Sequence, residues 1–172
     1  MDKNINDKEI VKEQLGRIPR GMIKVVARGI DNEPLVVETA PWVDNPKAKD
    51  GKEPFPTTFY LTSPKLSSDI STLESAGVMK ELQELITPDS DNYDLEIAKQ
   101  YKQDHYRYID FRDKLAAELK MPRLTDVYPD KFKEFSAGGM PNRVKCLHAL
   151  VAAEYGIGNV IGRMVLKHLS KI

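Results

Sequence analysis

The chain has 172 residues, and its 26 lysines and arginines balance its 26 aspartates and glutamates. This length suits one domain with its own hydrophobic core, and the neutral balance excludes the positive field with which basic domains attract nucleic acid or anionic membranes. A single cysteine, Cys146, excludes an internal disulfide framework and a metal cage built from several thiolates. We therefore expect no nucleic-acid partner, no cofactor and no metal, and a cytoplasmic protein whose thiol stays reduced.

The first twenty residues mix charged side chains with isolated isoleucine and valine. They lack the apolar run of a signal peptide or a membrane span, so we expect no membrane association. Ile18-Pro19-Arg20-Gly21 then interrupts regular structure, because proline followed closely by glycine favours a turn. We predict a flexible, weakly helical leader over residues 1–20 and a single domain over residues 21–172.

Short runs rich in isoleucine and valine predict an antiparallel hairpin near the start of the domain. Residues 22–28 and 35–39 are such runs, and residues 29–34 supply the turn. Residues 41–56 hold four prolines together with asparagine, aspartate and glycine, which favours an extended, exposed loop. Residues 57–62 predict a third strand.

The second half of the chain predicts helices. Apolar residues at helical spacing follow Pro64 and are interrupted at residues 75–77, which indicates two helices or one helix with a break. Residues 93–120 contain no proline or glycine and predict one long helix. Two more helices are expected over residues 142–155 and 159–169. The fold class is therefore α+β, with a small antiparallel sheet from the N-terminal half packed by several helices from the C-terminal half.

Gly138 and Gly139 precede the helix whose predicted opening residues include Arg143 and Lys145. A glycine pair lets backbone N–H groups converge, and cations beside a helix N-terminus are stabilised when an anion also binds there. The pattern indicates a small pocket for phosphate or carboxylate. In an equally open alternative, the glycines only make a tight turn and the cations pair with acidic side chains.

Cys146 and His148 lie two residues apart on the same predicted helix. A helix would separate them by about 200° around its axis, so they would face nearly opposite directions and could not form a nucleophile and base pair. Cys146 is expected to be a small buried apolar residue. His148 is expected to be a hydrogen-bonded residue at the edge of the buried stripe, or a support for the anion pocket.

A second group of candidate residues lines one face of the long predicted helix at spacing i, i+4, i+7 and i+11: Tyr101, His105, Tyr108 and Arg112. Such a face can bind an anionic or planar ligand through its cationic groups, with the tyrosines positioning it. In the alternative, the aromatic rings pack in the core and the polar tips reach solvent or neighbouring backbone. The sequence leaves both open.

Several segments together resemble a known family. The segments that carry the resemblance are Pro54-Phe55-Pro56-Thr57, Leu73-Glu74 followed by Gly77, the His105 to Asp113 stretch, and Ser136 through His148. Over roughly residues 17–155 the chain is similar to the bacterial domain-of-unknown-function family 501. Because that family has no assigned activity, the resemblance implies a shared pattern and no particular function.

The resemblance also implies what this chain lacks. The family pattern has a histidine, a Cys-Pro-Cys element and a further cysteine, where this chain has Ala27, Gly29, Asp31 and Ser63. A metal site that these cysteines would form in other members is therefore not expected here. Family genes often lie beside those of a septum-formation initiator-like protein and an exopolyphosphatase-like protein, an association that suggests cell division without a mechanism.

Two functions remain open. The first is binding of a small anionic or phosphate-bearing ligand, by an enzyme or a binding domain, through Gly138, Gly139, Arg143, Lys145, His148, His105, Tyr108 and Arg112. The second is a non-enzymatic interaction module, linked by association to cell division, which binds a protein partner through Trp42 and Phe55 of the proline-rich segment or through the charged long helix. No complete catalytic set separates the two, and catalytic residues stay unassigned.

Overall fold

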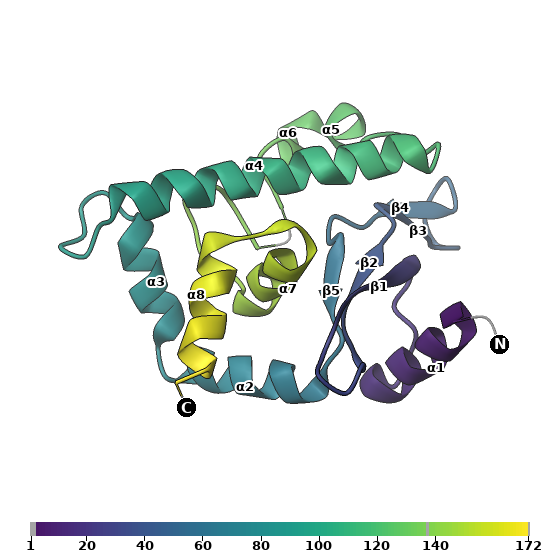
Figure 1. Cartoon of the computed structure of the whole chain (residues 1–172). Coiled ribbons are helices and arrows are strands. Elements are labelled where there is room, and N and C mark those ends of the chain that lie inside the picture. Colours follow the sequence, from purple (N-terminus) through teal and green to yellow (C-terminus); the bar gives the residue numbers. More distant parts are fainter. Residues whose placement is uncertain (1–2, 137, 172) are drawn as a thin grey trace.

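The computed structural model describes residues 3–136 and 138–171. Along them the helices are α1 (Lys3–Leu15), α2 (Pro64–Ser75), α3 (Val78–Ile86), α4 (Leu95–Glu118), α5 (Leu124–Val127), α6 (Pro129–Phe132), α7 (Leu147–Ile157) and α8 (Val160–Leu169). The strands are β1 (Met22–Arg28), β2 (Pro34–Thr39), β3 (Trp42–Asp44), β4 (Lys52–Pro54) and β5 (Phe59–Leu61). Strands in the first half and helices in the second confirm the predicted α+β class (Figure 1).

The main sheet is antiparallel, with strand order β1-β2-β5. Val37 in the central strand lies opposite Val25 of β1 and Tyr60 of β5. The β1–β2 turn is closed by the Gly29 N–H, which donates to the Glu33 carbonyl at 2.9 Å. The predicted hairpin and third strand are therefore confirmed.

The loop predicted over residues 41–56 is wrong, because the segment folds into a second hairpin. β3 and β4 pair antiparallel, with Trp42 opposite Pro54. Proline is tolerated at the end of an edge strand, where its missing N–H removes no ladder bond. The Trp42 indole N–H donates to the Pro122 carbonyl at 2.8 Å, and its ring centroid lies 6.3 Å from that of Tyr128. These contacts attach the hairpin to the segment that follows α4.

The helix expected within the first twenty residues is present as α1, which contacts β1 and β2. Val11 is fully buried, and the Asp7 carboxylate accepts two hydrogen bonds from Arg28 at 2.7 and 2.8 Å. The structure therefore packs this helix against the sheet. Its flexibility in solution stays a prediction.

α4 begins where the sequence predicts, after Asp94. The Asp94 carboxylate accepts the N–H groups of Glu96 and Ile97, each at 3.0 Å, and so caps the first turn. At 24 residues the helix extends about 36 Å. Figure 1 shows it running across the molecule from α3 to the β3–β4 hairpin.

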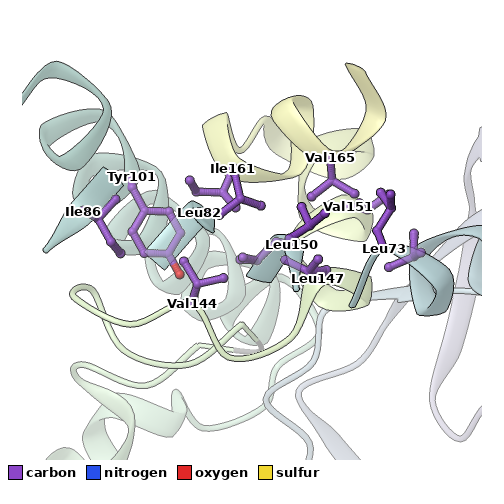
Figure 2. Packing of buried hydrophobic residues seen from close by; sticks show 12 residues of the cluster. Leu73, Leu82, Ile86, Tyr101, Val144, Leu147, Leu150, Val151, Ile161 and Val165 are labelled. Carbon is purple, nitrogen blue, oxygen red and sulfur yellow. The ribbon is translucent and has the colours of Figure 1, made fainter. Parts of the chain in front are cut away.

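α7 is the central helix of the core. It contacts all three strands of the main sheet, and it also contacts α2 and α8. Leu147, Leu150 and Val151 pack in a cluster shared with α2, α3, α4 and α8 (Figure 2). Ala152 and Ala153 pack in a second cluster with the sheet and α4. α7 is therefore apolar on the two sides that these clusters cover, whereas its polar residues His148 and Glu154 are only half-buried.

No single helix in the described ranges is long and apolar enough to cross a membrane. α7 and α8 meet the length and composition limits only as a pair, and the pair is bent by 106°.

Gly162 in α8 sets the close approach of α8 to α7. A Cβ at this position would overlap the backbone carbonyl of Leu150. Alanine at an open helical site would be better than glycine by about 1 kcal/mol, but overpacking against backbone, which cannot move aside, costs about 2–3 kcal/mol. We predict that Gly162→Ala lowers the free energy of unfolding by about 1–2 kcal/mol, measured by urea denaturation.

The control is Ser68→Ala on the exposed surface of α2, which should change the free energy of unfolding by less than about 0.5 kcal/mol. A Gly162→Ala protein as stable as the unmodified chain would contradict this packing of α7 on α8.

Candidate functional site

The helix predicted over residues 142–155 begins later, at Leu147. Arg143 and Lys145 therefore do not open a helix, and their predicted place at a helix N-terminus is wrong. Cys146 is the N-cap residue of α7, with the extended angles φ −148° and ψ 111°. Arg143, Lys145 and Cys146 thus lie on an extended segment, without regular secondary structure, that leads into α7.

Tertiary hydrogen bonds hold this leading segment extended. The Gln83 side-chain oxygen accepts the Val144 N–H at 2.7 Å, and the Tyr101 hydroxyl donates to the Arg143 carbonyl at 3.0 Å. A helix over residues 142–155 would need the Arg143 carbonyl as acceptor for the Leu147 N–H, but Tyr101 occupies this carbonyl and Glu74 accepts this N–H. The tertiary partners therefore override the helical propensity of the segment.

Gly138 and Gly139 form a tight turn, as in the alternative to an anion pocket. The Gly139 N–H donates to the Ser136 carbonyl at 3.1 Å, and the Gly138 carbonyl accepts the Lys145 N–H at 3.2 Å. Gly139 has φ +118°, which disfavours any side chain, and a Cβ on Gly138 would overlap the Leu150 side chain. The glycines permit close packing on α7, while anion binding at the turn stays a prediction.

The predicted face of α4 exists, and its four members are buried: Tyr101, His105, Tyr108 and Arg112. The Tyr108 hydroxyl accepts the backbone N–H groups of Thr58 and Phe59 at 2.7 and 3.2 Å. Burial raises the pKa of Tyr108, so the hydroxyl stays neutral.

Arg112 and His105 of the α4 face also bind the protein's own backbone. Arg112 donates to the carbonyls of Phe132 and Phe135 at 2.9 and 3.0 Å, and His105 contacts the Glu134 carbonyl. Burial lowers the pKa of both residues. This arrangement corresponds to the packing alternative, in which the polar tips reach neighbouring backbone.

Cys146 and His148 lie close together, so the prediction that they face opposite directions is wrong. That prediction assumed a helix through both residues, whereas Cys146 precedes the first turn. Glu74 near the end of α2 completes the group, and one ligand-type atom from each residue lies within 4.8 Å of the other two. Glu74 is not among the site residues predicted from the sequence, although it belongs to the Leu73-Glu74 motif of the family resemblance. We call these three residues the Glu74–Cys146–His148 cluster.

The hydrogen bonds of the cluster fix the orientation of the Glu74 carboxylate and the His148 ring. Glu74 Oε1 accepts the Leu147 N–H at 3.1 Å and lies 3.5 Å from His148 Nδ1. His148 Nε2 lies 3.1 Å from the Ser67 carbonyl and 3.2 Å from Ser71 Oγ. Because a carbonyl oxygen can only accept, Nε2 carries a hydrogen, and Nδ1 is the nitrogen directed at Glu74.

A cavity of about 390 Å³ opens beside the cluster, between α1, β5, α2 and the start of α7. Cys146 and His148 line it together with apolar residues, which include Leu15, Phe59, Leu61 and Ala149. This volume falls in the range of roughly 300–1,000 Å³ that is usual for small-molecule sites.

A second, more open hollow separates α3 from the segment before α7. It is lined by Lys80 and Arg143 among others, and its volume is about 500 Å³. Within the described residues, neither cation lies at ion-pair distance from a carboxylate. Arg143 and Lys80 thus line one hollow, whereas Gly138 and Gly139, with which the sequence grouped Arg143, form the turn that packs on α7.

The comparison with known families matches residues 25–167 to the family described as "Protein of unknown function (DUF501)". The chain belongs to this family. The resemblance drawn from the motifs is therefore confirmed, and the Glu74–Cys146–His148 cluster lies inside the matched range. No curated protein and no solved structure matches the chain.

The buried His105 makes stability depend on pH. Burial lowers its pKa, and the bond to the Glu134 carbonyl opposes this shift only in part. The unfolded chain, with a histidine pKa of about 6.5, then takes up a proton at higher pH than the folded chain. The stability from neutral His105 is complete above about pH 6.5 and is lost as the pH falls toward the folded pKa.

We therefore predict that the free energy of unfolding falls from about pH 7.5 to about pH 5.5 and that His105→Gln flattens this part of the curve. Urea denaturation at several pH values measures both. An equally steep fall in the variant would show that His105 is not its source.

Proposed function

We propose that the protein binds a small molecule in the cavity beside Cys146 and His148, with the thiol and the imidazole contacting the reactive part of that molecule. The observation that carries the proposal is that a thiol and an imidazole line a cavity of ligand size, with the Glu74 carboxylate within 4.8 Å of both groups. The apolar walls fit a small hydrocarbon body, and the cluster provides the polar end.

The cluster has the parts of a thiol-based reactive site. The His148 Nε2–H is held by the Ser67 carbonyl, which leaves Nδ1 able to accept a proton. The thiol and the imidazole lie within 4.8 Å, and a small approach to hydrogen-bond distance would give the pairing that activates cysteine nucleophiles. Glu74 already places a negative charge at the N-terminus of α7, which favours a neutral polar group over an anion at this point.

The hollow between Lys80 and Arg143 favours a second candidate, binding of a small anion. Two cations without a carboxylate partner among the described residues flank this hollow. The ligand class is the one that the sequence indicated, and the binding groups would be the Lys80 and Arg143 side chains. By contrast, Trp42 and Phe55, the expected anchors for a protein partner, are half-buried, and the Trp42 indole is engaged by the Pro122 carbonyl.

A thermal-shift screen tests both proposals. The probes are hexanol, hexanamide, hexanoate and inorganic phosphate. A compound at about a hundred times its Kd should stabilise the fold by roughly 2.7 kcal/mol. We predict that hexanol or hexanamide raises Tm and that Ala149→Leu, which fills the cavity, abolishes the rise.

The matched control is Ala117→Leu, the same change on the exposed surface of α4, which should keep the full shift. A shift of equal size in Ala149→Leu would place the bound compound elsewhere, and no shift with any six-carbon probe would contradict the cavity proposal. A phosphate shift that disappears in Arg143→Ala would instead support the second candidate.

A further inference from the structure

We infer that the Glu74–Cys146–His148 cluster binds one divalent transition metal ion of the zinc class, with a coordination position left open toward the cavity. This inference rests on the proposed cavity and deepens the proposed function: with the ion bound, Cys146 and His148 are its ligands, and the ion meets the polar end of the bound molecule in their place. It rests on the directions of the donor atoms, their spacing and their chemical types.

The first argument is that three hydrogen-bond acceptors of the cluster face one another, with too few hydrogen atoms to form bonds between all of them. His148 uses its Nε2–H on the Ser67 carbonyl, so in the neutral ring Nδ1 presents a lone pair to Glu74 Oε1 at 3.5 Å. The ionised carboxylate is also an acceptor, and Cys146 offers the one exchangeable hydrogen of its thiol. A cation between the three groups would satisfy all of them at once.

The second argument is the spacing. Two ligands each about 2.1 Å from a tetrahedral zinc ion lie about 3.4 Å apart, close to the Nδ1 to Oε1 separation of 3.5 Å. A thiolate about 2.3 Å from the ion lies about 3.6 Å from the other two ligands. Because the three donor atoms already lie within 4.8 Å, Cys146 needs only a small movement to complete the set.

The third argument is the support around the donors. The Ser67 carbonyl fixes the ring of His148, and the Leu147 N–H holds Glu74 Oε1. Metal-binding histidines generally donate their other ring N–H to a carbonyl or carboxylate, and ligating carboxylates are generally hydrogen-bonded. Both features are in place before any ion binds.

Sulfur, nitrogen and oxygen donors together suit zinc better than magnesium or calcium, which prefer oxygen alone. Three protein ligands with a fourth position open to a cavity are typical of zinc sites that act on a bound molecule. The ion would also offset the negative charges of Glu74 and the thiolate. A ligand carboxylate or hydroxyl could then occupy the fourth position.

The competing explanation is an ion pair between Glu74 and a doubly protonated His148, with no metal. Cobalt(II) distinguishes the two, because it substitutes for zinc and gives an intense thiolate-to-cobalt absorption band in the near ultraviolet. Cys146 is the only cysteine of the chain, so such a band can come from no other residue. The experiment uses the untagged, full chain, first treated with EDTA and dialysed, and checked for folding by circular dichroism.

We expect one cobalt ion per chain, with the thiolate band and the visible bands of tetrahedral cobalt. Cys146→Ser should abolish the thiolate band, and Glu74→Gln should weaken cobalt binding by about 10- to 100-fold or more. The matched controls are Glu81→Gln on the exposed face of α3 and His168→Gln near the end of α8, which should bind as the unmodified chain does. Cobalt binding without a thiolate band, or unaffected by both cluster variants, would overturn the inference.

Because a cluster variant can fail to fold, a second measurement uses the unmodified chain. Zinc at one equivalent should slow alkylation of Cys146 by iodoacetamide at least tenfold, while magnesium should not. Equal rates with and without zinc would overturn the inference. Neither measurement needs an organic ligand, so metal binding can fail while hexanol still binds in the cavity, or succeed while no organic probe binds.

Discussion

The polar face of α4 is the constraint on which the candidate site depends. Its side chains bind the backbone of three other segments: Tyr108 holds the start of β5, Arg112 holds the chain around α6, and Tyr101 holds the Arg143 carbonyl. Each buried polar tip has a backbone partner, which is what makes its burial tolerable. Through Tyr101, this face keeps the approach to α7 extended, and α7 therefore begins at Leu147.

The late start of α7 creates the site. A helix beginning earlier would separate Cys146 from His148 by about 200° and give each a different environment. With Cys146 as the extended N-cap, both side chains line one cavity, and Glu74 can bind the first N–H of the helix while facing His148. Glu74 thus has two roles: its carboxylate stabilises the start of α7, and the same carboxylate is a ligand in the proposed metal site.

The sequence predicts the helices and strands whose formation depends on neighbouring residues in the chain. The absence of proline and glycine predicted α4, and runs of isoleucine and valine predicted the β1–β2 hairpin. The β3–β4 hairpin was not predicted, because a segment rich in proline is typical of a loop. A strand tolerates proline only at positions such as a sheet edge, which the local sequence does not reveal. The cluster was missed for a different reason: Gln83 and Tyr101, distant in sequence, decide where α7 begins, and Glu74 meets Cys146 only in the folded chain.

X-ray absorption at the zinc edge tests the metal centre most directly, on protein reconstituted with one equivalent of zinc. The structure predicts a first shell with one sulfur at about 2.3 Å and nitrogen and oxygen neighbours at about 2.0–2.2 Å. Since the chain has a single cysteine, one sulfur identifies Cys146. A first shell of nitrogen and oxygen alone would contradict a metal centre built on Glu74, Cys146 and His148.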